Sequence, residues 1–216
     1  MIISHRHRFI YFSSPMTDCF AVEQLFLPFC EVGTTDYFSR GPDSPFYRYM
    51  PPDEAVWRFD AMGLDFYKYH RITCVRDPFP RLAALFDRIH AARPLTGLRR
   101  HDRAERFQRW LATTRPDGPG AGGRPDQLWR RYGAWSAENW CGGKITHVIR
   151  RERLDTDLAE VCADIGFAPG GVPVVPPDDP DDWLGHYGPE AIAHVRSHYA
   201  WDLDVLGYGT ADSCVA

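Results

Sequence analysis

Short apolar runs alternate with amphipathic stretches along this chain of 216 residues. Runs rich in aromatic and β-branched residues predict three buried strands, at residues 8–14, 67–75 and 144–149. Apolar residues at helical spacing predict helices after each strand and near the end of the chain. These helices cover residues 20–29, 53–62, 80–91, 102–113, 126–139, 154–165 and 189–199, and residues 201–208 follow the last of them.

Strands that alternate with helices in this way indicate an α/β fold with a central, mostly parallel sheet covered on both faces. The length suits a single domain, which we place over residues 1–216. Glycine, proline and small polar residues predict an ordered irregular loop at residues 33–52, a flexible loop at residues 114–125 and a rigid linker at residues 173–180.

The chemistry is expected where the predicted strands end, because ligands of parallel sheets bind beyond the carboxyl ends of the strands. Those ends are residues 14–19, 76–78 and 149–151, and arginine occurs at the second and the third. Arginine binds phosphate and sulfate through its planar fork, so an anionic ligand is indicated. The alternative is that Arg76 forms only a surface salt bridge with a neighbouring aspartate, which would contribute little.

The first of these ends reads SSPMTDCF, at residues 13–20, and leads from a strand into a helix. A turn of this kind presents free backbone N–H groups and the positive end of the helix dipole, so it can cradle a phosphate. It contains neither glycine nor lysine. An ordinary strand–helix connection, with Thr17 or Asp18 as the helix cap, is therefore the alternative.

Composition narrows the class of protein. A net charge of −4 and a pI near 6.1 argue against nucleic-acid binding through bulk charge. The six cysteines show no CxxC spacing and the nine histidines no HExxH pattern, so no metal is expected. Scattered cysteines with apolar neighbours predict reduced core thiols and a cytoplasmic location. No apolar stretch approaches the ~20 residues of a membrane span or forms a signal-peptide core, so neither is expected.

Taken together, the motifs resemble the sulfotransferase family, in particular its carbohydrate-sulfotransferase-like branch. Residues 9–23, FIYFSSPMTDCFAVE, are similar to the family's first strand and phosphosulfate loop. Residues 72–86, ITCVRDPFPRLAALF, are similar to its second strand and the arginine that follows. Residues 147–162 and 187–208 resemble its third strand and its closing helix, so the resemblance covers nearly the whole chain.

This resemblance implies a three-layer, P-loop-like fold and phosphoadenosine phosphosulfate (PAPS) as the donor, without a metal. It implies transfer of a sulfuryl group to a hydroxyl or amine of a carbohydrate or small-molecule acceptor. By position, Arg76 would contact the 3′-phosphate of the nucleotide, and Arg150 would lie near the nucleotide as well. The residues that would wrap the 5′-phosphosulfate are Pro15, Met16, Thr17, Asp18, Cys19 and Phe20.

The chain departs from the family pattern at positions that matter for transfer. The family's loop lysine, which neutralises charge on the bridging oxygen, falls at Met16, and losing one such donor costs ~10²–10³ in rate. Asp18 stands at a small glycine position, where a carboxylate can cap the helix and repel phosphate. Ala84 replaces the serine that joins Arg76 on the 3′-phosphate. The family's histidine falls near Tyr49, and Glu54 is the candidate replacement base.

Three hypotheses follow from the sequence. In the first, the protein is an active sulfotransferase in which Arg76, Arg81 or Arg150 does the work of the lysine, because Lys144 is expected at the opposite end of the sheet. In the second, it is a catalytically inactive relative that serves as a nucleotide- or anion-binding or interaction module. In the third, it is a different anion-binding enzyme that uses the same fold.

Overall fold

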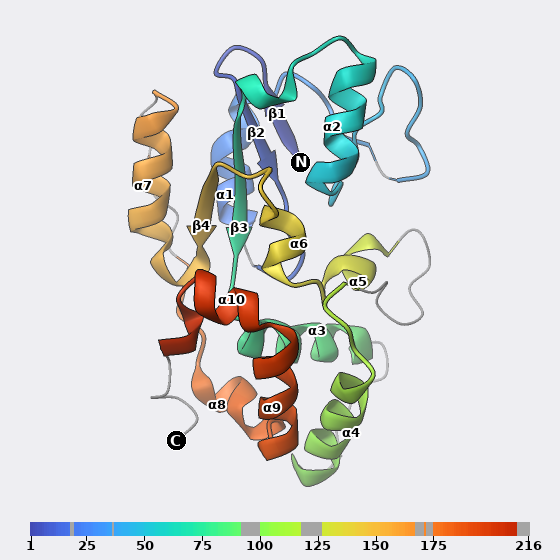
Figure 1. Ribbon diagram of the computed structural model, residues 1–216, viewed down its shortest axis with the longest axis vertical. Coiled ribbons are helices and arrows are strands. Elements are labelled where there is room, and N and C mark those ends of the chain that lie inside the picture. Colours follow the sequence, from blue (N-terminus) through green and yellow to red (C-terminus); the bar gives the residue numbers. More distant parts are fainter. Residues whose placement is uncertain are drawn as a thin grey trace.

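The computed structural model describes residues 1–17, 20–35, 37–91, 100–117, 127–166, 171 and 175–210. Four strands form one sheet, and they lie in it in the order in which they occur along the chain (Figure 1). They are β1 (Ile2–Ser4), β2 (Phe9–Phe12), β3 (His70–Val75) and β4 (His147–Arg150). The last three are parallel to one another, which confirms the predicted α/β class and the mostly parallel sheet.

The first strand was not predicted. β1 has only three residues, too few to show a period, and it runs antiparallel to β2 with Ile2 opposite Tyr11 and Ile3 opposite Ile10. Ile2 and Ile3 are both buried. A strand this short is stabilised by its pairing and by the core beneath it, rather than by its own sequence pattern.

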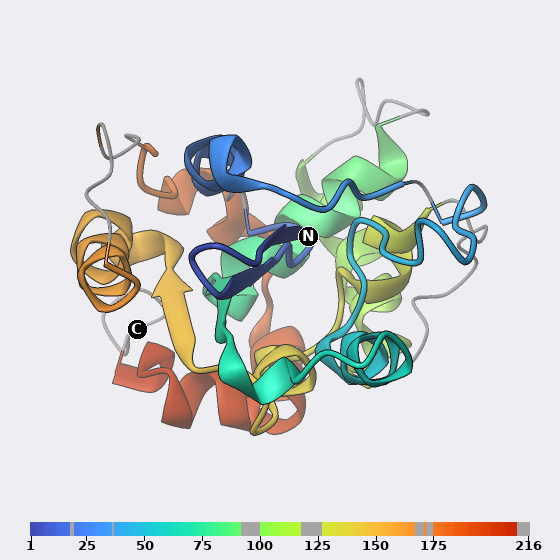
Figure 2. The same ribbon diagram turned by 90° about the horizontal axis from the view of Figure 1, so that it is seen from above.

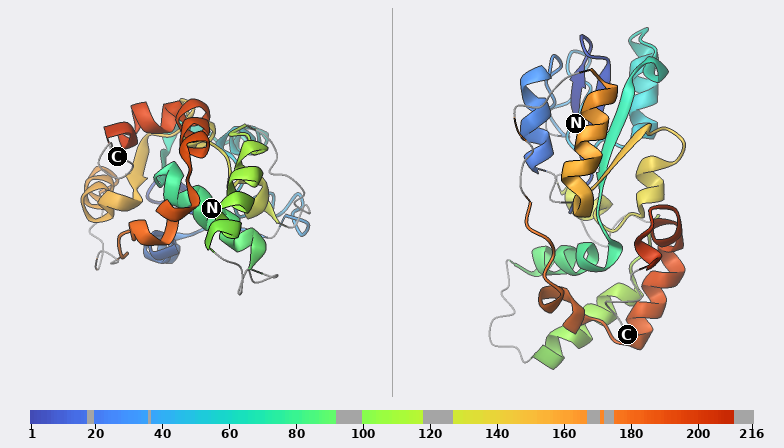
Figure 3. Two further views of the ribbon diagram at one scale, coloured as in Figure 1. Left: turned by 90° about the horizontal axis from the view of Figure 1, so that it is seen from below. Right: turned by 90° about the vertical axis from the view of Figure 1, so that its left-hand side faces the viewer.

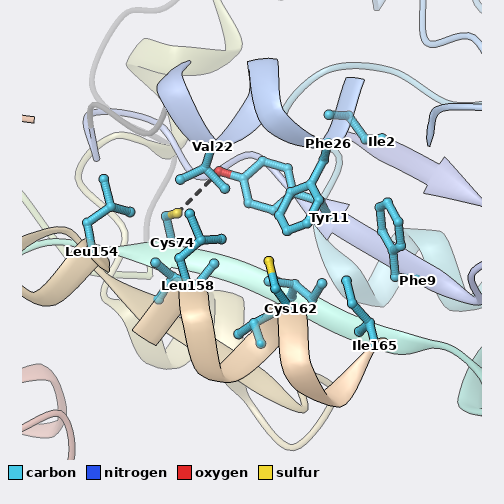
Figure 4. Close-up of a cluster of buried hydrophobic side chains, with 13 residues drawn as sticks. Ile2, Phe9, Tyr11, Val22, Phe26, Cys74, Leu154, Leu158, Cys162 and Ile165 are labelled. Atoms are coloured by element: carbon cyan, nitrogen blue, oxygen red, sulfur yellow. Dashed lines mark hydrogen bonds between the residues drawn. The ribbon is translucent and has the colours of Figure 1, made fainter. Parts of the chain in front are cut away.

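Helices α1 (Phe20–Phe26) and α7 (Leu154–Asp164) cover one face of the sheet, as the view from above shows (Figure 2). Their apolar side chains meet those of the strands in one cluster, with Tyr11 and Phe26 at its centre (Figure 4). The Tyr11 hydroxyl donates to the Cys74 thiol at 3.3 Å, which satisfies a polar group inside this cluster. Cys74, Cys141 and Cys162 are buried free thiols, so these three cysteines lie in the core as predicted.

Helices α2 (Pro52–Ala61), α5 (Leu128–Tyr132) and α6 (Ala137–Cys141) pack on the opposite face. The single helix predicted over residues 126–139 is wrong, because α5 and α6 are separate. Gly133 lies between them, where a Cβ would come within 2.5 Å of the Trp129 carbonyl oxygen. Ser136 then caps α6 by accepting a hydrogen bond from the Glu138 N–H at 3.0 Å.

A group of helices lies beyond the carboxyl ends of the parallel strands (Figures 1 and 3). The group consists of α3 (Pro78–His90), α4 (Arg100–Ala112), α8 (Pro180–Trp183), α9 (Pro189–His198) and α10 (Ala200–Val205). Phe86 and Phe107 are fully buried in their shared core. These helices therefore close over the edge at which ligands of parallel sheets bind.

The predicted loops are confirmed in part. Described residues between 33 and 51 form no regular helix or strand, and Phe46, Tyr47 and Met50 anchor them in the core. Most of the loop predicted at residues 114–125 lies outside the described residues. The predicted linker is described from residue 175, and its last residue, Pro180, begins α8. Within the part of the chain that is described, no helix has the length and apolar content to cross a bilayer.

A buried ion pair joins two helices of this group, and the same carboxylate links them to α6. Arg81 of α3 donates to the Asp202 carboxylate of α10 at 3.0 Å, and both side chains are buried. The other Asp202 oxygen accepts from the Ala137 N–H at 2.8 Å and from the Ser136 hydroxyl, at the start of α6. Arg81, which the sequence suggested as a ligand-facing arginine, is thus engaged within the core.

Replacing Asp202 with asparagine should destabilise the fold strongly. Asp202→Asn leaves the Arg81 guanidinium buried without its charged partner, which costs about 3–5 kcal/mol of unfolding free energy. Urea denaturation followed by circular dichroism measures this loss. Asp204→Asn, an exposed neighbour in α10, is the matched control and should change stability by less than about 0.5 kcal/mol. Equal losses in the two variants would contradict a structural role for the Arg81–Asp202 pair.

Candidate functional site

The turn after β2 is held in an unusual backbone conformation. Met16 has φ of 65°, in the left-handed region that residues other than glycine adopt rarely. The Thr17 hydroxyl donates to the Ser14 carbonyl at 2.8 Å, which closes the turn. Pro15 is buried and Phe20, the first residue of α1, is exposed. Asp18 and Cys19, the remaining predicted phosphosulfate-loop residues, lie outside the described residues.

Arg76 connects the end of β3 to this turn. Its Nη1 donates to the Met16 carbonyl oxygen at 3.1 Å. On its other side, Nε donates to Asp178 Oδ2 at 2.9 Å, and Nη2 contacts the second oxygen of the same carboxylate. The guanidinium is buried and binds Asp178 in the bidentate geometry typical of arginine with carboxylate or phosphate.

Arg151 reaches the same carboxylate from the end of β4. Its Nη1 lies 3.1 Å from Asp178 Oδ2, and its Nη2 donates to the Pro176 carbonyl at 2.9 Å. The sequence alone did not distinguish Arg151 from Arg150, because either of two adjacent residues can face the carboxyl edge of the sheet. Asp178 was missed altogether, since it follows Arg76 by 102 positions in the chain.

Arg150 turns in a different direction. Its Nε donates to the Leu206 carbonyl at 3.0 Å, and its Nη1 donates to Asp157 at 3.2 Å. It lines a cleft of about 470 Å³ between the ends of β3 and β4 and the last turn of the chain that is described. Asp77, Glu152 and Tyr208 line the same cleft.

The cleft is organised around Glu152. One carboxylate oxygen accepts from the Asp77 N–H at 2.9 Å, and the other accepts from the Tyr208 hydroxyl at 2.9 Å. Burial raises the pKa of Asp77 to about 6, although the hydrogen bond from the Phe79 N–H opposes the shift. Burial and the neighbouring Glu152 also raise the pKa of Tyr208, so this phenol stays protonated.

The turn, Arg76 and Arg150 therefore lie at the same edge of the sheet, where the sequence placed them. The chain matches no protein-family model, no curated protein and no solved structure.

A larger hollow, of about 620 Å³, lies between α2 and the segment before β3, lined by Trp57 and Tyr67 among others. It is next to the amino end of β3, so it is separate from the site predicted at the carboxyl edge.

Arg88 of α3 lies beside the Met16 side chain. Nη1 of Arg88 lies 3.9 Å from the Met16 sulfur, and the same guanidinium stacks 4.4 Å above the Trp129 ring. Burial raises the pKa of the Tyr49 phenol, and the positive charge of Arg88 opposes part of this shift. Tyr49 also has a left-handed φ, of 63°. Backbone strain of this kind is often retained at functional sites.

Glu54 and Lys144 are engaged away from the turn. Glu54 accepts hydrogen bonds from Tyr47 and from Arg58, the latter at 3.1 Å. Lys144 forms an ion pair with Asp53, and its carbonyl accepts from Arg71 near the start of β3. Lys144 therefore lies at the amino end of β3, as expected. The role of Glu54 as a base stays a prediction.

The raised pKa of Asp77 gives a pH-dependent stability. Its folded-state pKa of about 6 lies above its ordinary value of 3.8, so the folded state binds this proton more tightly. The resulting stabilisation is full below about pH 4 and is lost as pH rises through about 6. Asp77→Asn stays neutral and can still cap α3, so it should exceed the wild type in unfolding free energy by about 3 kcal/mol at pH 7.5.

Urea denaturation at pH 4 and pH 7.5 measures this difference, which should shrink at the lower pH. Asp43→Asn, a neutralised carboxylate in an exposed loop, is the control and should follow the wild-type profile at both values. An Asp77→Asn variant that is less stable than the wild type at pH 7.5 would contradict a raised pKa for Asp77 in the folded protein.

Proposed function

We propose that this protein is a PAPS-dependent sulfotransferase with a three-layer, P-loop-like fold. The observation that carries this proposal is the hydrogen bond from Arg76 to the Met16 carbonyl. It joins the end of β3 to the turn after β2, the two segments in which the resemblance to sulfotransferases is expected to bind the donor. Helices on both faces of a mostly parallel sheet support the proposed fold.

In this proposal the turn at residues 15–20 wraps the 5′-phosphosulfate, and Arg76 binds the 3′-phosphate. The Arg76 fork already holds a carboxylate through two N–H groups, and phosphate oxygens fit the same geometry. Arg150 lines the adjoining cleft and contributes positive charge near the nucleotide. The acceptor is a hydroxyl or amine of a carbohydrate or small molecule.

Transfer forms a bond between sulfur and the acceptor oxygen or nitrogen, and it breaks the bond between sulfur and the bridging oxygen of the donor. The acceptor proton passes to a base, and the desulfonated nucleotide (PAP) leaves with the negative charge. That charge needs a positive partner, which Met16 cannot supply. Arg88 supplies it in this proposal, because its guanidinium lies at the tip of the Met16 side chain.

The second candidate function is binding without transfer. Asp178 already occupies the fork of Arg76, and methionine stands where the family has its lysine. Both observations favour an inactive module that binds a nucleotide or another anion. Tyr49 does not act as the base, because a phenol with a raised pKa donates a hydrogen bond instead of taking a proton.

Arg76→Ala should abolish PAP binding, because the 3′-phosphate loses its two-pronged partner. Isothermal titration calorimetry with PAP measures the affinity, and circular dichroism confirms that the variant is folded. Arg106→Ala, an exposed arginine in α4, is the control and should bind as the wild type does. Unchanged affinity in Arg76→Ala would remove Arg76 from the site. A wild-type protein that does not bind PAP would overturn the proposed function.

Arg88→Ala should slow sulfuryl transfer by ~10²–10³ while leaving PAP affinity nearly unchanged, because the lost charge acts on the leaving oxygen. Transfer of labelled sulfuryl from PAPS to a panel of carbohydrate and small-molecule hydroxyls measures the rate. Met16→Lys in the Arg88→Ala background should restore transfer. Wild-type rates in Arg88→Ala would rule out this role for Arg88, and PAP binding without any transfer by the wild type would favour the inactive module.

A further inference from the structure

Arg76 and Arg151 together form a buried oxyanion seat, whose occupant in this structure is a side chain of the protein itself. We infer that the Asp178 carboxylate competes with the phosphate of an incoming ligand for this seat and is displaced when the phosphate binds. The inference rests on the proposed function only for the identity of the ligand as PAP. The seat itself is defined by its two guanidinium groups.

The seat is buried at the carboxyl ends of the parallel strands. The side chains of Arg76 and Arg151 are only 6% and 7% exposed, and Asp178 between them is 16% exposed. The arginines come from the ends of two neighbouring parallel strands, so the sheet fixes their spacing. A carboxylate held by two guanidinium groups from separate strands shows that this position accepts an anion.

Charge favours a phosphate over the resident carboxylate. Asp178 brings a single negative charge between two guanidinium groups, whereas a phosphate monoester carries about −1.5 to −2 at neutral pH and has three acceptor oxygens. Each arginine could then bind a separate edge of the phosphate in the two-pronged manner. The folded chain already holds both arginines out of solvent, so the ligand need not organise them.

The chain around Asp178 is suited to local movement. Residues 175–179, here named the strap, form no helix or strand and lead directly into α8. Within the strap only Val175 and Asp178 are partly buried, and Pro176, Pro177 and Asp179 are exposed.

The two ends of the strap are held independently of the seat. Val175 packs against the cluster beneath α7, and the Asp179 side chain caps α8 by accepting from the Asp181 N–H at 3.0 Å. The strap contacts the seat through the Asp178 carboxylate and the Pro176 carbonyl. The cap of α8 is made by Asp179, so it does not depend on either of these two groups.

The decisive variant is Asp178→Asn, which removes the competing charge and preserves the side-chain shape. If the seat is filled by Asp178 in nine molecules of ten, this variant should bind PAP about tenfold more tightly than the wild type. Asp182→Asn, an exposed aspartate of α8, removes the same charge from the same region and should leave the affinity unchanged. Calorimetry with PAP gives the three dissociation constants.

A second measurement uses the unaltered protein, in case Asp178→Asn fails to fold. Hydrogen exchange of the strap, residues 175–179, in the wild type should become faster on saturation with PAP, because the strap loses its contacts with the seat. Exchange around Arg76 and Arg151 should become slower at the same time. Unchanged or slower exchange in the strap would overturn the inference.

Inorganic pyrophosphate separates the failure of this inference from that of the proposed function. In one outcome, no variant binds PAP but Asp178→Asn gains or strengthens binding of pyrophosphate. This result would overturn PAPS as the donor and support the inference that Asp178 competes with an incoming anion. Equal PAP affinity in the wild type and Asp178→Asn would overturn the inference that Asp178 competes with the ligand. PAPS would then remain the proposed donor. Failure of every protein to bind either probe would overturn both.

Discussion

Parallel pairing of β2, β3 and β4 is the constraint on which the rest of this structure depends. The register sets Tyr11 opposite Ile72 and Ile72 opposite His147, so the three strands end at nearly the same level. Whatever follows each strand is therefore delivered to one edge: the turn at Met16, the guanidinium of Arg76 and the pair Arg150–Arg151. The candidate site is a direct product of this pairing.

The arginines at that edge are held by carboxylates from the later part of the chain. Asp178 engages Arg76 and Arg151, Asp157 engages Arg150, and Asp202 engages Arg81. Buried or half-buried guanidinium groups need such partners, because an isolated charge away from water is costly. These carboxylates differ in their surroundings. Asp202 lies deep in the core, whereas Asp178 lies on an exposed strap.

The site therefore contains two separate centres of positive charge. One is the seat of Arg76 and Arg151, beneath the strap, and the other is Arg88 beside Met16. A donor that carries a phosphate at one end and a reacting anhydride at the other would require both. The methionine in the turn does not by itself decide between transfer and binding, because charge supplied from α3 would act at the same place as charge supplied from the loop.

The sequence by itself determined the α/β class, three of the four strands and the placement of Arg76 and Arg150 at the carboxyl edge of the sheet. It could do so because strand and helix periods and chain direction are local properties. Only the tertiary structure decided that β1 exists, that α5 and α6 separate at Gly133, that Arg81 is engaged in the core and that Asp178 occupies the seat. β1, Arg81 and Asp178 each depend on a partner elsewhere in the chain, which no local pattern encodes. The break at Gly133 depends on close approach both to the Trp129 carbonyl and to Leu85 of α3.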